Sequence, residues 1–385
     1  MLTAIIGGDI CPSAKGRSFP MGDSAEAVFG SLLPDLLNAD LAIANMECPL
    51  TDVDTPIRKC GPNLRAPVAT IEVIRKAGIK VLNMANNHIL DHGASGLDST
   101  SRAAATAGIA TVGAGSNRAE ARRILICPFR GVRVGILGVT EQEFSIATDT
   151  SPGANPLDLI DMTRNIAAHR SSIDYLIVLL HGGNEHYAYP SPRLTETCRF
   201  LVEQGANAVI CQHSHCVGCC EEYRGGHIVY GQGSLICGSP NPIPGLDHGV
   251  LVRLHISGGR TSRMELVPFE RTHIGLGIRK MPPKAAEVLL QAVAERSSNL
   301  GIPGFIQEHW NRFCSERQNG YLSLALGHGR ILRRLNRHGL LFRLFYSAAS
   351  QLAMENVIRC EAHREVLETV FDEMRQSATP PTRGS

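Results

Sequence analysis

Aromatic side chains are scarce in this sequence of 385 residues: they make up 5% of it and include a single tryptophan. A surface that binds nucleic acid by stacking needs aromatic residues interleaved with basic ones, and no segment has that composition. Lys and Arg number 38 against 36 Asp and Glu, and the resulting net charge of +2 indicates no particular partner. Nucleic-acid binding therefore has no support in the sequence.

Long apolar runs and a secretion signal are absent as well. No uninterrupted apolar run reaches the roughly 20 residues that span a bilayer. The first ten residues, MLTAIIGGDI, lack a basic start and reach an acid too early for a signal peptide. We therefore expect a cytoplasmic protein whose 12 cysteines are reduced thiols.

Three of these cysteines, Cys216, Cys219 and Cys220, form a C-x-x-C-C cluster directly after a pair of histidines. Such a cluster can bind zinc or undergo redox chemistry. A four-thiolate zinc site would need a second C-x-x-C motif, which the sequence does not contain. We favour structural thiols and keep the zinc or redox site as the alternative.

Short apolar runs alternate with helical patterns from Thr3 to about Phe269. Seven runs have the composition of buried strands that end in glycine or polar residues, namely AIIGGD, LAIANMECP, KVLNMANNH, RVGILGVTE, YLIVLLHGG, AVICQHSH and IVYGQGS. Helical patterns lie between them, at SAEAVFGSLLPDLLNA, PVATIEVIRKAG, LDSTSRAAATAG, LIDMTRNIAAHRSSI and RLTETCRFLVEQG, and Gly78, Gly108 and Gly205 stand where helices would end. The alternation predicts an α/β fold with a layered sheet core, whose ligands bind beyond the carboxyl ends of strands.

The pattern becomes purely helical after about Arg271. We predict a main domain over residues 1–270, a helical extension over 271–376 and a disordered tail over 377–385. Residues 328–345, HGRILRRLNRHGLLFRLF, alternate basic and apolar side chains. We expect a helix packed on the main domain with its arginines solvated; a helix on a membrane surface or an anionic partner is the alternative.

Carboxylates, an amide and imidazoles collect at the ends of the predicted strands. Such side chains are the ligand set of two adjacent divalent metals, one carboxylate can bridge the pair, and histidines favour Zn, Fe or Mn. His213 and His215 lie two residues apart in a predicted strand, so both rings are expected to face one site. The sequence therefore predicts a metal site formed by Asp9, Glu47, Asn87, His88, His181, His213 and His215.

The order of these motifs resembles a known family, the CapA-like proteins of poly-γ-glutamate capsule biosynthesis, in the calcineurin-like metallophosphoesterase superfamily. The resemblance runs from Ile5 to about Pro268 and rests on six segments: GGDI, FGSLLPDLLNADLAIANMECPLT, GIKVLNMANNHILDHGASGLDST, GIATVGAGSNRAEA, LLHGGNEHYAYP and QHSHCVGCCEEYRGGHIVYGQGS. It implies a layered αββα sandwich and a metal-dependent hydrolase or transferase that acts on poly-γ-glutamate or another cell-envelope polymer.

The resemblance also implies a role for each residue. One metal would be held by Asp9, Glu47 and His215, with Glu47 bridging to a second metal held by Asn87, His181 and His213. His88 would be the acid/base beside the metals without binding either. Asp91, three residues further on, can orient His88 if a helix begins there.

Four further residues are candidates for substrate binding. Lys59 and Arg65 lie near the expected mouth of the site, where positive charge can steer an anionic polymer or small-molecule substrate. Glu185 and His186 follow the HGG turn and are expected to reach the substrate.

The sequence departs from the family in three places. Asp9 is followed by Ile10 and Cys11 where dinuclear phosphoesterases carry D-x-H, so the first metal site lacks the imidazole that this motif supplies. The family's L-G-N turn is Q-G-S at residues 232–234. Family members commonly carry an N-terminal membrane anchor, and we expect none here because the sequence starts directly at the first predicted strand. The missing histidine of the first motif and the added C-terminal third motivate a second hypothesis, a weakly or non-catalytic component that binds polymer and docks a synthase or membrane through its helical extension.

Overall fold

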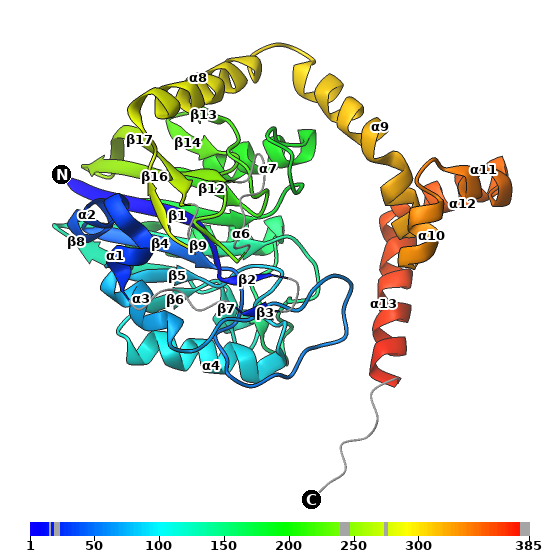
Figure 1. The fold of residues 1–385 in the computed structure, drawn as a ribbon, viewed down its shortest axis with the longest axis horizontal. Coiled ribbons are helices and arrows are strands. Elements are labelled where there is room, and N and C mark those ends of the chain that lie inside the picture. The colour runs from blue at the N-terminus through cyan, green and yellow to red at the C-terminus, as the bar shows by residue number, and fades with distance from the viewer. Residues whose placement is uncertain (15–16, 19–23, 239–246, 273–275, 328, 378–385) are drawn as a thin grey trace, which may run out of the picture. The chain divides into compact units, whose positions relative to one another are not determined.

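Two β-sheets lie face to face between residues 2 and 280 (Figure 1). The computed structural model describes residues 1–14, 17–18, 24–238, 247–272, 276–327 and 329–377. In spatial order, the first sheet contains β18 (Ile278–Lys280), β17 (Arg260–Arg271), β16 (His248–Ser257), β1 (Leu2–Cys11), β4 (Leu41–Met46), β5 (Val81–Asn83) and β6 (Ala110–Val112), and β15 (Ile236–Cys237) pairs with β1. The second contains β13 (Cys220–Tyr223), β14 (Gly226–Val229), β12 (Ala208–Gln212), β11 (Tyr175–His181), β9 (Val132–Thr140) and β8 (Leu125–Phe129).

The centre of each sheet is parallel. Strands β1, β4, β5 and β6 run in one direction in the first sheet, as do β9, β11, β12 and β14 in the second. Antiparallel strands complete the edges. The short pairs β2 (Ser13–Ala14) with β3 (Arg17–Ser18) and β7 (Ala114–Gly115) with β10 (Gly153–Ala154) lie outside these sheets.

The core between the sheets follows from the alternation of side chains along each strand. In β11, Tyr175, Ile177 and Leu179 point to the first sheet and pack in one apolar cluster with its side chains. The intervening Val178 and Leu180 point outward and pack under helices. Both faces of the strand are buried, which explains its continuous apolar run.

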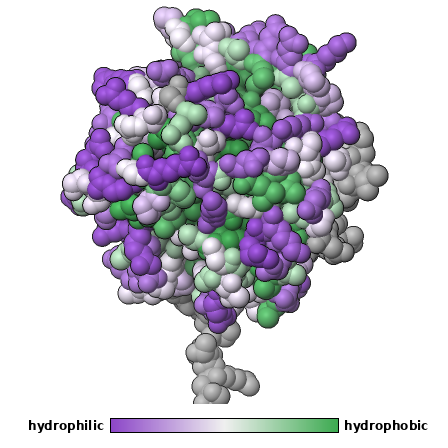
Figure 2. Space-filling view, turned by 90° about the vertical axis from the view of Figure 1, so that its left-hand side faces the viewer, coloured by the Kyte–Doolittle hydropathy of each residue, from purple (hydrophilic) through white to green (hydrophobic). Residues whose placement is uncertain are grey.

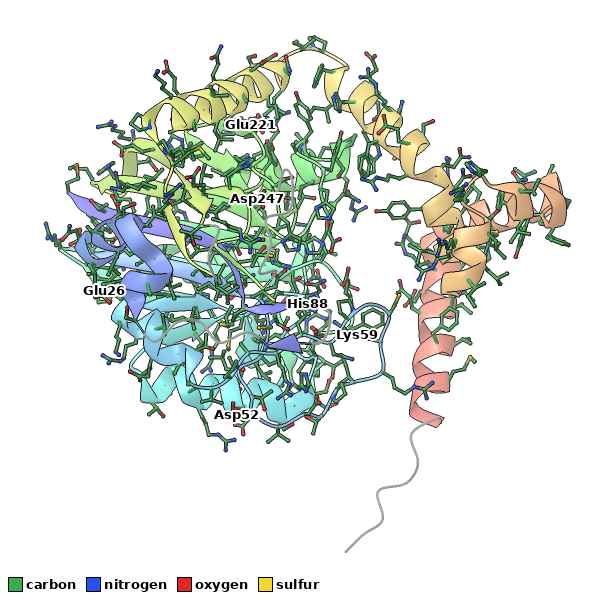
Figure 3. The ribbon with its side chains drawn as sticks, viewed as in Figure 1. Glu26, Asp52, Lys59, His88, Glu221 and Asp247 are labelled. Atoms are coloured by element: carbon green, nitrogen blue, oxygen red, sulfur yellow. The ribbon has the colours of Figure 1, made fainter. Side chains whose placement is uncertain are left out.

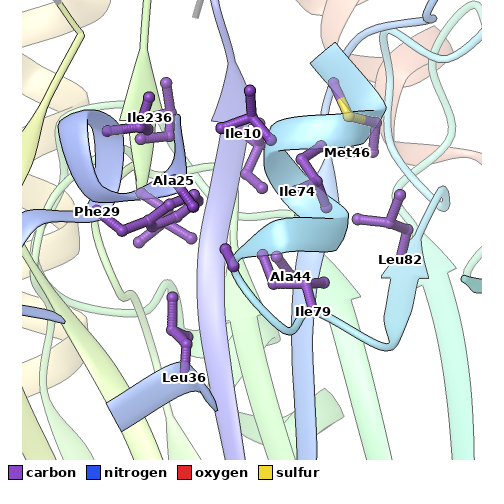
Figure 4. Close-up of a cluster of buried hydrophobic side chains, with 14 of the residues drawn as sticks. Ile10, Ala25, Phe29, Leu36, Ala44, Met46, Ile74, Ile79, Leu82 and Ile236 are labelled. Atoms are coloured by element: carbon purple, nitrogen blue, oxygen red, sulfur yellow. The ribbon is translucent and has the colours of Figure 1, made fainter. Parts of the chain in front are cut away.

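Helices cover the outer face of each sheet. On the second sheet these are α6 (Leu159–His169) and α7 (Pro192–Glu203). On the first they are α1 (Ala25–Phe29), α2 (Leu33–Asn38), α3 (Thr70–Lys76) and α4 (Gly93–Thr106), whose apolar side chains, Phe29 and Ile74 among them, fill the cluster in Figure 4. The remaining short helix in this part of the chain is α5 (Arg118–Ala121). The predicted αββα sandwich is confirmed.

The predicted helix ends at Gly78, Gly108 and Gly205 are confirmed, because all three adopt the positive φ angles of a left-handed helix cap, 81°, 70° and 111°. The single helix expected over 24–39 is wrong. Gly30, at φ 47°, ends α1, and a 3₁₀ turn (Gly30–Leu32) leads into α2. A Cβ at Gly30 would lie 2.6 Å from the carbonyl oxygen of Ile278, so the break is fixed by a close backbone contact.

Helix α8 (Pro283–Asn299) packs against one strand of each sheet, β17 of the first and β13 of the second. Val293 anchors it in a small cluster with Val217 and Val250. By its contacts the chain divides into two compact units, Met1–Gln307 and Glu308–Ser385, so α8 belongs to the first unit. The boundary near residue 270 stays a prediction.

The second unit is entirely helical among its described residues. Helix α9 (Phe305–Ala325) leads into α10 (Arg330–Leu335), α11 (Leu340–Phe345), α12 (Ala348–Arg359) and α13 (Glu361–Ser377). The buried Asn336 joins three of these segments: its Nδ2 donates to Ser323 Oγ at 2.9 Å and its Oδ1 accepts from the Leu341 amide at 2.8 Å. The C-terminal helices are thus confirmed. Of the predicted tail, residues 378–385 lie outside the described residues.

The segment 328–345 forms two short helices, α10 and α11, separated by a turn. Its first residue lies outside the described residues. None of the described helices has the length and apolar composition that would let it cross a bilayer. On the face of the molecule in Figure 2, apolar side chains lie in small patches among polar ones.

Candidate metal centre

Residues from both sheets meet where the parallel strands end. Asp9 lies near the end of β1, Glu47 directly follows β4, and His181 is the last residue of β11. Their side chains are between 1% and 4% exposed. Four of the six predicted ligands lie in the loops that follow their strands: Glu47, Asn87, His213 and His215.

Glu47 is shared by two groups of potential ligands. The ligand atoms of Asp9, Glu47 and His215 all lie within 4.8 Å of one another, and so do those of Glu47, His181 and His213. Glu47 Oε1 lies 3.7 Å from His215 Nε2 and 3.8 Å from His181 Nε2. The geometry thus places one carboxylate between two mixed oxygen and nitrogen groups, although the roles of these residues as ligands stay a prediction.

Asn87 joins the second group through its side-chain oxygen. Asn87 Oδ1 lies 3.1 Å from His181 Nε2, and His181 Nε2 lies 3.2 Å from His213 Nδ1. On its other side, Asn87 Nδ2 donates a hydrogen bond of 2.9 Å to Glu143 Oε2. Because Glu143 engages the amide nitrogen, the amide oxygen faces the histidines.

The electrostatics of this buried site favour a bound cation. Burial raises the pKa of Glu47 to about 8, and the neighbouring Asp9 carboxylate adds to the rise. Burial lowers the pKa of His215, but Glu47 and Asp9 outweigh it and bring that pKa to about 10. Burial holds the pKa of His181 well below its usual range, so this imidazole is neutral and able to donate a lone pair. Two carboxyl groups beside imidazoles, of which His181 is neutral, are a donor set that fits divalent ions once Glu47 and His215 have released their protons.

His88 directly follows Asn87 and forms a hydrogen-bonded group with Asp91 and Lys59. Figure 3 labels His88 and Lys59, which lie close to each other. His88 Nδ1 is 2.6 Å from Asp91 Oδ2, and the Lys59 ammonium lies 3.1 Å from the same nitrogen while pairing with Asp91 Oδ1. The Leu64 amide also donates to Asp91 Oδ2, at 2.6 Å. Asp91 is completely buried, whereas the His88 side chain is 13% exposed. Asp91 therefore orients an imidazole that remains accessible.

Two local expectations about this region are wrong. Helix α4 begins at Gly93, so Asp91 reaches His88 from the preceding turn, in which the Asp91 amide donates to the His88 carbonyl at 2.9 Å. Strand β12 ends at Gln212, so strand alternation is not what aligns His213 and His215. Both adopt left-handed backbone conformations, with φ of 90° and 56°, in the loop that follows. The loop, and not the pleat of a strand, turns both rings toward Glu47.

The candidate substrate-binding residues differ in their surroundings. The Lys59 side chain is only 3% exposed and is engaged by Asp91 and His88. Arg65 is partly exposed and lies 3.7 Å from Asp54. Glu185 and His186 are exposed, and the ring of His186 lies 6.3 Å from that of His215. Their role in binding substrate stays a prediction.

The sequence reasoning did not identify Asn45. Its Nδ2 donates to Asp9 Oδ1 at 2.7 Å and lies 3.3 Å from His181 Nδ1, and its Oδ1 accepts from Asn83 and Asn86. Asn45 therefore contacts two predicted ligands, Asp9 and His181, and helps to fix their positions. Its position two residues before Glu47 was an available signal, because alternate strand residues share a face.

Glu143 and Ser234 were missed too. Glu143 lies just past the end of β9, and Ser234 Oγ lies 2.9 Å from His215 Nδ1. Ser234 belongs to the Q-G-S turn that departs from the family pattern, so a hydroxyl makes this contact to the imidazole. The C-x-x-C-C cluster takes no part in either ligand group. Burial raises the pKa of Cys220 to about 12 and that of Cys219 still further, which fits unreactive structural thiols.

The stacked sheets and the polar centre at their strand ends define an αββα protein with a candidate metal centre. The chain belongs to the family described as "Bacterial capsule synthesis protein PGA_cap", whose model matches residues 3–239. The predicted membership of a CapA-like family is thus confirmed.

Known relatives agree with this assignment. The chain is 29% identical to "Capsule biosynthesis protein CapA" of Bacillus anthracis, over 69% of this chain and 67% of the relative. It is 26% identical to "PGA biosynthesis protein CapA" of Bacillus subtilis (strain 168), over 70% and 72%. Among solved structures, a 5'-nucleotidase precursor from Thermus thermophilus matches with a TM-score of 0.44 and 15% identity, over 76% of this chain and 58% of that one. A likeness at that level supports no functional argument.

Proposed function

We propose that the chain is a metal-dependent hydrolase that cleaves an amide or phosphoester bond in the biosynthesis of poly-γ-glutamate or another anionic envelope polymer. The position of Glu47 between two ligand groups carries the proposal, because a carboxylate shared in this way is what a two-metal site requires. The names of the relatives support the polymer, and the buried donor set supports the chemistry.

Two divalent ions, when bound, supply Lewis acidity and a hydroxide at neutral pH. Asp9, Glu47 and His215 would hold one, and Glu47, Asn87, His181 and His213 the other; Mn, Zn and Fe all suit such ligands. His88 contributes proton transfer. Because Asp91 engages its Nδ1, its Nε2 is left to face the substrate, where it would take a proton from water when the ring is neutral and give it to the leaving group once the ring is protonated.

Substrate would approach from the exposed side of the centre. The exposed Glu185 and His186 follow β11 on that side, and Arg65 is partly exposed on the loop that also carries Lys59. An arginine can attract a polyanion, while Lys59, held against Asp91, would act on His88 and not on distant substrate.

Metal content and hydrolysis test the proposal together. Purified wild-type protein is expected to contain about two divalent ions per chain by mass spectrometry and to hydrolyse a γ-glutamyl amide or a phosphomonoester in a metal-dependent way. His213→Ala is expected to lose one ion and Glu47→Gln both, with activity reduced by at least about 100-fold.

Glu196→Gln on α7 is the matched control for Glu47→Gln, because Glu196 is exposed and lies outside both ligand groups. It should keep full metal content and activity. A wild-type protein that binds no divalent ion and shows no metal-stimulated hydrolysis would refute the proposal, as would equal metal content in the two glutamine variants.

A second candidate function is supported by the described helices of the second unit. They expose large apolar side chains beside arginines, a composition typical of helices that bind an anionic membrane surface. In α10 to α13 the exposed apolar residues are Ile331, Leu332, Leu335, Leu340, Phe345, Leu352, Ile358, Val366, Leu367, Val370, Phe371 and Met374. In this function the chain would be an assembly component that brings the polymer site to a membrane-bound synthase.

Vesicle flotation tests this second candidate. Full-length protein is expected to float with vesicles that contain phosphatidylglycerol and not with vesicles of phosphatidylcholine alone. Ile331→Glu with Leu335→Glu, at positions 79% and 67% exposed, should abolish flotation without changing hydrolysis. Equal recovery with both vesicle types, or with neither, would remove the candidate.

A further inference from the structure

An open apolar groove of about 660 Å³ lies along α8, outside the candidate metal centre. Its size is within the range of about 300–1,000 Å³ that is typical of small-molecule sites. It is lined by Ala188, Cys216, Val217, His248, Met281, Ala285, Val288, Leu289, Ala292 and Arg296.

One stripe of α8 forms a wall of this groove. Ala285, Val288, Leu289, Ala292 and Arg296 are spaced by three or four residues, so they share a face of the helix. The helix is held in place from another side by Val293, which is buried against Val217 and Val250. The wall of the groove is therefore a helix that is anchored in the apolar core.

Arg296 places a positive charge in this apolar lining. Its Nε donates to the Gly218 carbonyl and its Nη2 to the Val217 carbonyl, both at 3.1 Å. Among the described residues its polar contacts are these two backbone carbonyls, and no carboxylate pairs with it. A guanidinium has five N–H donors, so three remain after these two contacts. Burial lowers the pKa of His248, the other ionisable base of the lining, so Arg296 alone supplies charge at neutral pH.

An apolar groove with one fixed cation is complementary to a ligand that has an apolar chain and a single negative charge. We propose that the groove binds a free single-chain aliphatic carboxylate, with its chain along the α8 stripe and its carboxylate on the guanidinium of Arg296. The two backbone carbonyls hold the guanidinium in a fixed orientation, and a carboxylate can accept two parallel hydrogen bonds from such a group. The site makes no use of metal chemistry and stands independently of the proposed hydrolysis.

The groove adjoins the loop that carries His215. Cys216 directly follows that histidine, and the Gly233 amide donates to the Cys216 carbonyl at 3.2 Å. A ligand in the groove therefore touches the outer side of a loop whose inner side faces Glu47.

Calorimetry on the full chain tests the proposal with dodecanoate, dodecanol and dodecyltrimethylammonium below their micelle concentrations. Dodecanoate is expected to bind at least about tenfold more tightly than either of the others, because only it can pair with Arg296. From octanoate to dodecanoate, affinity should rise by about fourfold per methylene, which corresponds to ~0.8 kcal/mol each.

Two variants on the same helix separate the groove from the rest of the surface. Ala292→Phe fills the hollow and should abolish dodecanoate binding, whereas Ala294→Phe, exposed and outside the lining, should leave it unchanged. Arg296→Gln should reduce the affinity for dodecanoate to that for dodecanol.

Three results would overturn the proposal: equal binding of the three dodecyl probes, no dependence on chain length, or equal binding by the two phenylalanine variants. Since metal content and hydrolysis are measured on the same wild-type protein, a failure of this site is distinguishable from a failure of the metal centre.

Discussion

The ion pair between Lys59 and Asp91 allows a quantitative test of how the candidate site is held together. The two side chains are 3% and 0% exposed, so neither charge can be compensated by solvent. Removing one partner of a buried pair costs about 3–5 kcal/mol, because the other charge stays behind unpaired. In Lys59→Met, Asp91 keeps His88 and the Leu64 amide as partners, so we expect a loss near the lower limit, about 3 kcal/mol.

Urea unfolding followed by circular dichroism measures this loss. If the free energy of unfolding falls by ~3 kcal/mol for each molar of urea, the urea concentration at the midpoint of unfolding should fall by about 1 M. Arg75→Met is the matched control, since Arg75 pairs with Glu72 at 3.0 Å on the surface, with both side chains about half exposed. Such pairs contribute roughly 0–1 kcal/mol. Equal midpoints for the two variants would refute the claim that burial makes the Lys59 pair important.

A double substitution separates the pair energy from packing. Lys59→Met together with Asp91→Leu removes both charges and leaves no unpaired one. The double variant should therefore be more stable than the sum of the two single losses predicts, by about 1–3 kcal/mol. Additive losses would mean that the two charges do not stabilise each other.

Two further predictions concern the backbone beneath the site and its protons. Gly138→Ala should lower the free energy of unfolding in urea by about 2–3 kcal/mol, because its Cβ would lie 2.1 Å from the Asn83 side-chain oxygen. The control Gly131→Ala, which has open space around it, should lower it by about 1 kcal/mol. Equal losses for the two variants would contradict this prediction. Glu47 and His215, with pKa values of about 8 and about 10, hold protons that a divalent ion must displace. The affinity for the metal should therefore rise between about pH 6 and 8, by up to about tenfold per pH unit for each proton released. Calorimetry in two buffers of different ionisation heat measures the release, and a pH-independent affinity would contradict it. The pKa of Glu47 is above its unfolded value of 4.5, so its contribution to the stability of the metal-free chain is full below pH 4.5 and is lost as the pH rises through about 8.

The sequence predicted the layers of the fold well because each central strand is buried on both faces. The continuous apolar run of β11 and the polar residue at its end are the direct result of its position between two layers. The helix ends at Gly78, Gly108 and Gly205 were equally readable, since a left-handed cap strongly favours glycine. These signals are local, and local signals are what a single sequence contains.

The contacts around the site could not be read in the same way. Asn45 reaches Asp9 and His181 from a third strand, and Glu143 reaches Asn87 across 56 positions of sequence. Such contacts depend on how two sheets stack, which no residue spacing encodes. Lys59 is the clearest case: in the sequence it is one of several basic loop residues, and only the folded loop places it against Asp91.

The backbone at three histidines gives an independent reason to treat this edge of the fold as functional. His186, His213 and His215 all have φ between 56° and 90°, a region that side-chain-bearing residues rarely adopt and that costs about 1–3 kcal/mol per residue. The fold holds two of them there by backbone contacts, because the His213 amide donates to Asp9 Oδ2 at 3.2 Å and the His186 amide to the Ser214 carbonyl at 2.8 Å. Glycine would relieve the strain at each position but would remove an imidazole. Stability alone favours glycine there, so the presence of His213 and His215 in the two ligand groups of Glu47, with the ring of His186 6.3 Å from that of His215, is best explained by what imidazoles bind.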